Sequence, residues 1–348
     1  MIARWKKYEL QFKRPALTSR GAYKTRTVWY LFLEKDDFTG VGECAPLPGL
    51  SKETPEQVEE LLDKICRDPE SYLWTPQLTK NISSVHFALE TAWFDLNNGG
   101  IRQLFSSGFS KGLAGIPVNG LIWMGDAESM QRQVDQKIDE GFTCIKLKIG
   151  GIDFEKEIGI LKYIRSKYSP AQIILRIDAN GAFSPYEALT KLDRLAPLQI
   201  HSIEQPIAAG QWKALARICR ESPIPVALDE ELIGIYSEEE KAKLLDAISP
   251  QYLVLKPSLH GGMSGCNNWI KLAESHSTGW WVTSYLESNI GLNAIAQWAY
   301  QMNTKGYQGL GTGALFLNNI PSPLEIRGEE LWMNTNKTFR MPENIILK

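Results

Sequence analysis

CIKLK (144–148) opens a series of five short apolar segments that each end in a charged residue. The others are IILRID (173–178), HSIE (201–204), PVALD (225–229) and YLVLK (252–256). The terminal charges recur every 25 to 30 residues and are Lys148, Asp178, Glu204, Asp229 and Lys256. A strand, a helix and their two loops together occupy a repeat of about this length. If each unit adds one parallel strand, all five charges emerge at the same end of one sheet.

The chain around these segments alternates predicted strands and helices from about residue 115 onward. We expect the first strand at IPVNGLI (116–122), the seventh at WWVTSYLES (280–288) and the eighth at YQGLGTG (307–313). Continuously hydrophobic strands of this kind are typical of parallel sheets that are buried on both faces. An open doubly wound sheet would need a glycine-rich phosphate turn after its first strand, and neither 261–265 nor 309–313 stands there. The sequence therefore predicts an α/β fold, a parallel barrel of about eight strands and seven helices, with its site at the carboxyl ends.

The first 112 residues follow a different order, with three predicted strands followed by two helices. The helices are expected at 53–67 and 82–96, where apolar residues recur at helical spacing. A run of strands followed by a run of helices is typical of an α+β domain. We therefore expect residues 1–112 to form an α+β capping domain and residues 113–317 to form the barrel. The C-terminal segment from about 318 to 348 is expected to pack back on the capping domain.

The composition excludes several classes of protein. The 348 residues are 43% hydrophobic and 22% charged with a net charge of −2, so no global field recruits nucleic acid or an anionic membrane. No apolar run approaches the ~18 residues of a membrane-spanning helix, and the N-terminus lacks the apolar core of a signal peptide. The five cysteines are scattered without a CxxC pair, which favours reduced thiols over a zinc site. We expect a cytoplasmic protein.

Three carboxylates end neighbouring predicted strands. Asp178, Glu204 and Asp229 should converge on one side of the rim, where uncompensated carboxylates raise one another's pKa. A hard divalent cation would relieve this repulsion, and oxygen ligands with room for water favour Mg²⁺ over zinc. Each carboxylate taken alone could instead cap a turn or a helix. Their common register over successive repeats favours a shared metal site.

Two lysines end strands that face each other across an eight-stranded ring. Lys148 lies on the second strand and Lys256 on the sixth, so they should flank the metal from opposite sides. Lys146 points the same way as Lys148 because alternate residues of a strand share a face. Close ammonium groups lower each other's pKa, and such a lysine can act as a general base. This grouping suits removal of a proton next to a carboxylate.

Weaker candidates surround this set. Four residues end the last two predicted strands and should meet the substrate: Ser284, Glu287, Ser288 and Thr312. Lys146 is expected to help hold the substrate carboxylate. Four other residues could either support the site or have a simple packing role: Arg176, Asn180, Glu230 and His260.

These motifs, taken as a set, resemble the enolase superfamily over nearly the whole chain, and the paired lysines resemble its muconate-lactonising branch. The motifs are KxK at 146–148, DxN at 178–180, EQP at 204–206, DE at 229–230 and KP at 256–257. The resemblance implies that Asp178, Glu204 and Asp229 bind Mg²⁺, and that Lys148 and Lys256 flank a small carboxylate substrate. It also implies that a loop of the capping domain closes over the substrate, here Thr18 to Tyr23 with Arg20.

Motifs that this chain lacks exclude some groups of enzymes that the resemblance would otherwise allow. Lys256 stands where the mandelate racemase group has an Asp, and Gly311-Thr312-Gly313 replaces the Asp-x-Asp of dipeptide epimerases. Muconate cycloisomerases, N-succinylamino-acid racemases and o-succinylbenzoate synthases remain. LRIDAN (175–180) and SYLESNIG (284–291) look most like the o-succinylbenzoate synthase family.

That resemblance implies a magnesium-dependent lyase of menaquinone biosynthesis. In it, Lys148 would remove the alpha proton of 2-succinyl-6-hydroxy-2,4-cyclohexadiene-1-carboxylate and Lys256 would stabilise the anion. A barrel that binds a carboxylate ligand without turning it over is the alternative from another class.

Overall fold

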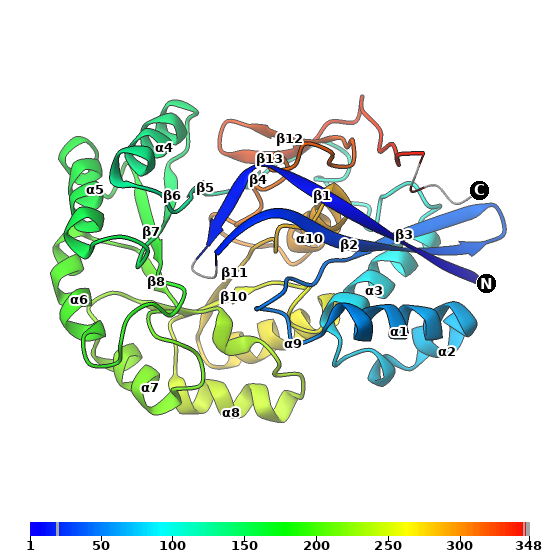
Figure 1. Cartoon of the computed structure of the whole chain (residues 1–348), viewed down its shortest axis with the longest axis horizontal. Coiled ribbons are helices and arrows are strands. Elements are labelled where there is room, and N and C mark those ends of the chain that lie inside the picture. The colour runs from blue at the N-terminus through cyan, green and yellow to red at the C-terminus, as the bar shows by residue number, and fades with distance from the viewer. Residues whose placement is uncertain (19–20, 344, 346–348) are drawn as a thin grey trace.

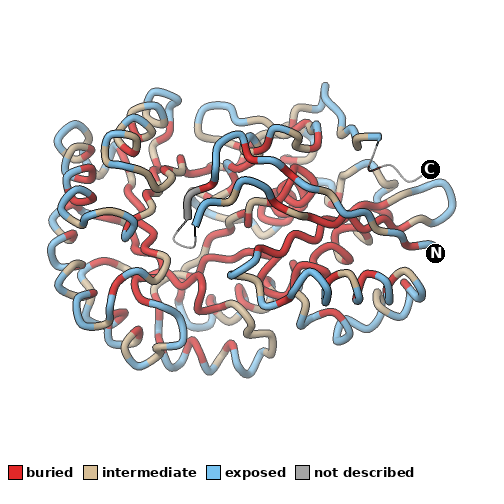
Figure 2. Tube along the Cα trace, viewed as in Figure 1, coloured by how far each residue is buried: buried red, intermediate tan, exposed pale blue. Residues whose placement is uncertain are grey.

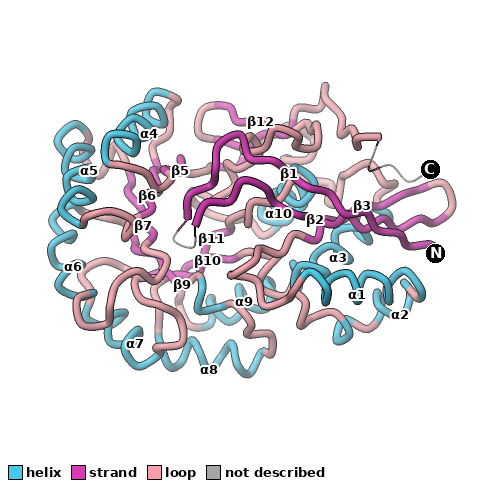
Figure 3. Tube along the Cα trace, viewed as in Figure 1, coloured by secondary structure: helices cyan, strands magenta, loops and turns pink. Residues whose placement is uncertain are grey.

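The computed structural model describes residues 1–18, 21–343 and 345. Figure 1 shows a blue N-terminal sheet lying beside a barrel whose green and yellow helices form the outer layer. Figure 3 shows the same arrangement by secondary structure, with helices around a curved row of strands. The predicted change from an α+β region to a strand–helix repeat is confirmed.

The N-terminal region is an antiparallel sheet covered on one face by helices. Its strands are β1 (Ile2–Thr18), β2 (Gly21–Lys35) and β3 (Phe38–Cys44), in that spatial order. The helices are α1 (Pro55–Arg67), the short α2 (Pro69–Trp74) and α3 (Ser83–Asn97). Gly42 of β3 touches α3 so closely that a Cβ would lie 1.8 Å from the Ala88 carbonyl oxygen. The absence of a side chain at this position therefore sets how tightly α3 packs on the sheet.

The barrel sheet contains seven parallel strands in the order in which they occur along the chain. They are β5 (Gly120–Ile122), β6 (Cys144–Lys148), β7 (Ile174–Asp178), β8 (Ser202–Glu204), β9 (Val226–Leu228), β10 (Tyr252–Leu255) and β11 (Gly279–Val282). The helices that follow them are α4 (Ala127–Asp139), α5 (Phe154–Lys167), α6 (Ala188–Leu195), α7 (Trp212–Glu221), α8 (Glu238–Ile248), α9 (Gly262–Ser275) and α10 (Asn289–Gln301). Among the described residues, this matches the seven helices expected for the barrel.

The eighth predicted strand differs from the expectation. Gln308 and Gly309 make single parallel bridges to Val118 and Thr283, so two residues join the edges of the sheet where a whole strand was expected. A Cβ on Gly309 would lie 2.2 Å from the Thr283 side-chain oxygen, and glycines weaken strand pairing. The glycine-rich run 309–313 therefore closes the barrel as a loop.

The segment around the first predicted strand also divides. β4 (Ile116–Pro117) leaves the barrel sheet and pairs with β13 (Glu330–Met333), which forms a hairpin with β12 (Leu324–Arg327). Phe316 and Ile320, just before this hairpin, are buried against Leu10 and Phe12 of β1. The C-terminal part of the chain thus contacts both the capping region and the start of the barrel. The exact division at residues 112 and 317 stays a prediction.

The largest apolar core lies between the barrel strands and their helices, and a second one lies under the N-terminal sheet. Figure 2 shows this burial along the barrel strands and the inner side of the N-terminal sheet. All five cysteines are free thiols, as expected. Within the described ranges, no helix is both long and apolar enough to cross a membrane.

Candidate active site

The five charged residues meet at the carboxyl ends of five consecutive strands, β6 to β10. Lys148 pairs in register with Asp178, and Asp178 pairs with Glu204, so these three lie at one level. Asp229 and Lys256 directly follow β9 and β10. All five line one cavity of about 900 Å³, measured with its open mouth. The predicted convergence is therefore present in the structure.

The carboxylates of the rim are buried and covered by lysine ammonium groups. Asp178, Glu204 and Asp229 are each at most 2% exposed. Lys146 Nζ lies 2.5 Å from Glu204 Oε2 and 3.0 Å from Asp178 Oδ2, and so bridges two strands. Lys256 forms an ion pair with Asp229. Buried carboxylates of this kind must be paired or bound to a cation.

Lys148 shares a carboxylate oxygen with Lys146. Its Nζ lies 3.1 Å from Asp178 Oδ2 and donates a hydrogen bond to Asn180 Oδ1 at 2.7 Å. The expectation that Lys146 and Lys148 point the same way is thus confirmed. Asn180 in turn donates to Glu230 Oε1 at 3.1 Å, so both residues support the site at its edge.

The carboxyl groups of the rim differ in pKa. Burial, and then the charge of Asp178, raises the pKa of Glu204 to about 8. Burial also raises the pKa of Asp229. For Asp178, burial acts in the same direction, but Lys146 and Lys148 outweigh it and hold the pKa well below its usual value. The three carboxylates are therefore unequal, because the lysines cluster on Asp178.

Lys146 departs from the sequence-based expectation, whereas Lys256 agrees with its expected ammonium form. Burial disfavours the ammonium form of Lys146, but the charges of Asp178 and Glu204 outweigh it and raise the pKa. Burial likewise opposes the ammonium of Lys256, and Asp229 with Glu204 raises its pKa. The lowering predicted from two close ammonium groups is wrong for Lys146, since its Nζ lies between the carboxylates of Asp178 and Glu204.

The donor set fits a divalent cation. Glu204 Oε1 and Asp229 Oδ1 are buried and have no hydrogen-bond partner among the described residues. An unpaired carboxylate oxygen in such a place is costly unless a cation or a ligand satisfies it. No three His, Cys, Asp or Glu side chains in the described ranges form a ready-made metal cluster, because lysines stand between the carboxylates.

The rest of the cavity wall is largely apolar and comes from both regions of the chain. Leu47 and Leu50 come from the capping region, as does Tyr23, which lies on β2. Arg20, which was expected to act in a loop from Thr18 to Tyr23, lies outside the described residues. Tyr285 and Leu286 follow β11 and face the same space. Sequence reasoning missed these apolar residues, since nothing in a loop pattern marks a leucine as a wall residue.

Ser284 and Thr312 lie in the cavity wall as expected. Their hydroxyl oxygens are 2.6 Å apart, which joins the end of β11 to the loop that closes the barrel. Glu287 is different, because its carboxylate turns away from the cavity and bonds to Ser258 Oγ and the Tyr285 backbone. Ser288 is also directed elsewhere, and caps α10 by accepting from Ile290 N.

Two other weak candidates, His260 and Arg176, have structural roles near the site. His260 Nδ1 accepts a hydrogen bond from the Lys256 backbone N–H at 3.1 Å, so this ring supports the loop after β10. Arg176 lies two residues before Asp178, donates to the Tyr307 carbonyl and stacks over Trp281 at 4.3 Å. It fills the barrel below the site.

Comparisons with known proteins agree with this geometry. Residues 129–334 match the family described as enolase C-terminal domain-like, and residues 3–96 match the MenC N-terminal domain. An o-succinylbenzoate synthase from Desulfotalea psychrophila is 44% identical over 93% of this chain and 96% of its own length. An N-succinylamino acid racemase from Thermus thermophilus is 30% identical over 81% of this chain and 78% of its own.

A solved structure extends the likeness to three dimensions. The crystal structure of MenC from Desulfotalea psychrophila superposes with a TM-score of 0.86 at 42% identity, covering 95% of this chain and 99% of that one. The chain belongs to the enolase superfamily and resembles its o-succinylbenzoate synthases over nearly its whole length.

Proposed function

We propose that the chain is an o-succinylbenzoate synthase of menaquinone biosynthesis. It would convert 2-succinyl-6-hydroxy-2,4-cyclohexadiene-1-carboxylate into 2-succinylbenzoate and water. The observation that carries this proposal is the pair of lysines in one cavity, Lys148 on β6 and Lys256 after β10, with three carboxylate-bearing strands between them. The 44% identity with a protein of that name supports the choice of substrate.

Asp178, Glu204 and Asp229 are the residues that would hold Mg²⁺. The unpaired oxygens of Glu204 and Asp229 support this assignment. When bound, the ion would supply positive charge against the substrate carboxylate and the negative charge that develops on it. Lys146, which bridges Asp178 and Glu204, is placed to contact the same carboxylate.

Lys148 is the proposed base. As a free amine it takes the proton from the carbon next to the carboxylate, and the electrons of that C–H bond form an enediolate. Those electrons then expel the hydroxyl group from the neighbouring carbon, and the Lys148 ammonium returns the proton to it. Water leaves, the ring becomes aromatic, and Lys148 is again an amine. Lys256, as an ammonium group, stabilises the enediolate from the other side.

The apolar wall would hold the ring and exclude water. Leu47 and Leu50 approach from the capping region, and Tyr285 and Leu286 approach from the barrel. A dry wall of this kind strengthens the electrostatic interactions inside the site. Loss of the hydroxyl group from a ring that becomes aromatic requires orientation more than it requires a strong acid.

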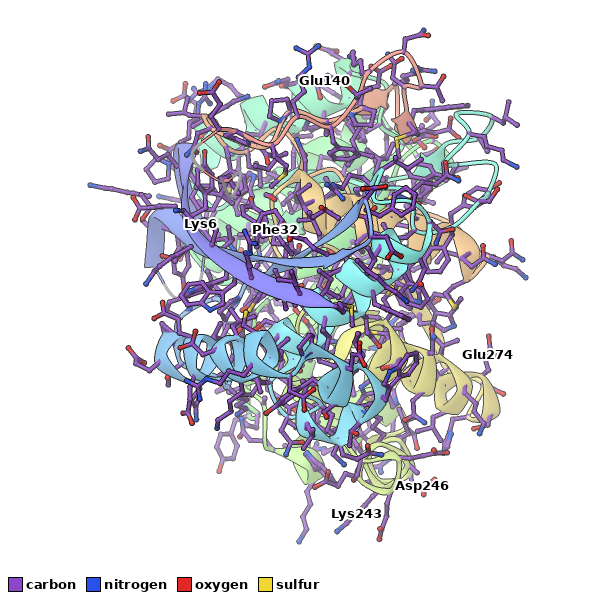
Figure 4. The ribbon with its side chains drawn as sticks, turned by 90° about the vertical axis from the view of Figure 1, so that its right-hand side faces the viewer. Lys6, Phe32, Glu140, Lys243, Asp246 and Glu274 are labelled. Carbon is purple, nitrogen blue, oxygen red and sulfur yellow. The ribbon has the colours of Figure 1, made fainter. Side chains whose placement is uncertain are left out.

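An ultraviolet assay for the aromatic product tests the proposal. We expect Mg²⁺-dependent product formation by the wild-type protein and by Lys243→Ala, since Lys243 lies exposed on the outer side of α8 (Figure 4). We expect none from Lys148→Ala. If the wild-type protein forms no aromatic product in the presence of Mg²⁺, the proposal is wrong.

N-succinylamino acid racemase activity is the second candidate. It is favoured by the same two lysines, which could exchange a proton on opposite faces of one carbon, and by the 30% identity with a protein of that name. It requires Lys256 to give up its proton, whereas the dehydration does not. Incorporation of deuterium from solvent at the alpha carbon of an N-succinylamino acid, measured beside the first assay, separates the two. If neither activity appears and a carboxylate still binds, a barrel that only binds its ligand becomes the better description.

A further inference from the structure

The loop after β11 carries a strained leucine at the cavity wall. Leu286 has a backbone φ of +59°, in the left-handed region that a branched side chain rarely occupies. Its side chain and that of Tyr285 line the cavity. A strained residue at a ligand site persists only where the surrounding structure enforces it. Some interaction must therefore hold this loop.

Glu287 supplies that interaction from behind the wall. Its side chain is fully buried, and both carboxylate oxygens accept hydrogen bonds. Oε2 accepts from the Tyr285 backbone N–H at 2.5 Å, which folds the chain back around Leu286. Oε1 accepts from Ser258 Oγ at 2.5 Å, two residues after Lys256. The carboxylate thus ties the loop that carries the wall to the loop that carries a catalytic lysine.

The next residue is held from the other side by the capping region. Glu43 of β3 accepts from the backbone N–H and the hydroxyl of Ser288, and from Gly291 N at 2.7 Å. A Cβ on Gly291 would lie 2.7 Å from the Glu287 Cβ, so the glycine lets the first turn of α10 pack directly against Glu287. The loop is therefore fixed on both sides of residue 287.

We propose that Glu287 is a positioning residue that sets the shape of the substrate cavity. It holds Leu286 in the left-handed conformation, so that Leu286 and Tyr285 together form the wall against the ring and its succinyl arm. Glu287 itself does not touch the substrate. This inference rests on the proposed function for the identity of the substrate, but the loop geometry stands without it.

Two substitutions separate positioning from direct action on the substrate. A glutamine at 287 can still accept from the Tyr285 N–H through its amide oxygen and can donate to the Ser258 hydroxyl through its amide nitrogen. An alanine can do neither. For Glu287→Ala we expect KM to rise about 10- to 100-fold while kcat falls less than about threefold, because the wall binds ground state and transition state alike. Glu287→Gln should stay within about threefold of the wild type in both constants.

Controls keep the test decisive. Glu274→Ala, on the exposed face of α9 (Figure 4), should match the wild type. If Glu287→Ala does not fold, Ser258→Ala removes one of the two hydrogen bonds and should raise KM by about threefold. A Glu287→Gln protein whose KM rises as far as that of Glu287→Ala, or whose kcat falls by more than about threefold, would overturn the proposal, since the charge itself would then act on the substrate.

Amide hydrogen exchange over residues 284–288 provides a readout that needs no activity. We expect faster exchange in Glu287→Ala than in the wild type, and wild-type exchange in Glu287→Gln. Unchanged exchange in Glu287→Ala would also overturn the inference. A wild-type protein that forms no aromatic product but shows this exchange pattern would instead reject the proposed function and leave the positioning role intact.

Discussion

Carboxylates at the barrel rim are satisfied differently from those at the contact between the capping region and the barrel, which we call the seam and which contains the buried Glu43 and the half-buried Glu90. At the rim, Glu204 and Asp229 each keep one oxygen without a partner in the described part of the chain, and lysines cover the others. At the seam, Glu43 accepts from the first turn of α10, and Glu90 accepts from Met263 N and Ser264 N at the start of α9. Helix N-termini favour carboxylates because their N–H groups point outward unpaired.

From this difference we infer that the seam carboxylates serve the fold, whereas the rim carboxylates are the proposed ligands of a cation. The seam carboxylates lock the capping region onto the loops after β10 and β11, and so fix part of the cavity wall. The rim carboxylates stay incompletely paired, at a cost that a bound cation would relieve. Substitutions at the seam should therefore lower stability, whereas substitutions at the rim should abolish chemistry.

The largest expected effect is at the rim. Lys148→Ala should lower kcat by about 10³- to 10⁴-fold, since a positioned base contributes on that order. The fold should be retained because Asp178 keeps Lys146 at 3.0 Å. Steady-state kinetics and a thermal unfolding curve check both statements. Substantial turnover in a folded Lys148→Ala protein would remove Lys148 from its role.

Glu204→Gln should reduce kcat/KM by more than about 100-fold, since one proposed ligand of the cation is lost. Burial already favours the neutral form of Glu204, whose pKa is raised to about 8. The free energy of unfolding without Mg²⁺ should therefore change by less than about 1 kcal/mol. Chemical denaturation in the presence of a metal chelator measures this free energy of unfolding. A large decrease in the free energy of unfolding without Mg²⁺ would mean that Glu204 stabilises the fold, as the seam carboxylates do.

At the seam, the stability should depend on pH through Glu43. Burial raises its pKa from 4.5 to about 7, against the hydrogen bonds from Ser288 and Gly291. The folded state thus favours the neutral acid, and the resulting stabilisation is complete below pH 4.5 and lost as the pH rises through 7. The full span is about 3 kcal/mol.

Glu43→Gln provides the control for that pH dependence, because a glutamine cannot ionise. The difference in free energy of unfolding between wild type and Glu43→Gln should fall as the pH rises from 4.5 to above 7. Urea denaturation at several pH values measures it. A difference that is flat, or that grows with pH, would mean that Glu43 is ionised in the folded protein.

Glu90→Ala should have the smallest effect. It removes two hydrogen bonds from the start of α9, and we expect a loss of about 1–2 kcal/mol of stability with kcat nearly unchanged. Thermal unfolding and steady-state kinetics test this together. A large drop in kcat without a loss of stability would show that the seam acts on the chemistry directly.

The residues of the rim could be predicted from the sequence because they recur at a regular interval along the chain. Strand ends recur along the chain, and parallel strands bring their carboxyl ends to one edge, so Asp178 and Lys256 could be placed together without coordinates. The same reasoning placed Glu287 wrongly toward the cavity. It gives the position of a residue on a strand end, but not the direction of a side chain in the loop beyond, where Leu286 adopts a left-handed conformation.

The seam had no signal in the sequence. Glu43 and Ser288 are 245 residues apart, and no periodicity links a β3 carboxylate to the N-terminus of a distant helix. The prediction of an eighth strand was wrong for a local reason. The glycines of 309–313 favour a loop, which closes the barrel through two single bridges. The raised pKa of Lys146 depends on its distances to Asp178 and Glu204, which only the fold supplies.

Calorimetric titration of Mg²⁺ into the metal-free protein tests the central claim most directly. The wild type and Glu43→Gln should each bind about one ion per chain, because two carboxylates of the rim, Glu204 and Asp229, each hold a buried oxygen without a hydrogen-bond partner in the described part of the chain. Asp229→Asn should bind far more weakly. Wild-type binding that persists unchanged in Asp229→Asn, or no binding by the wild type at all, would contradict the account.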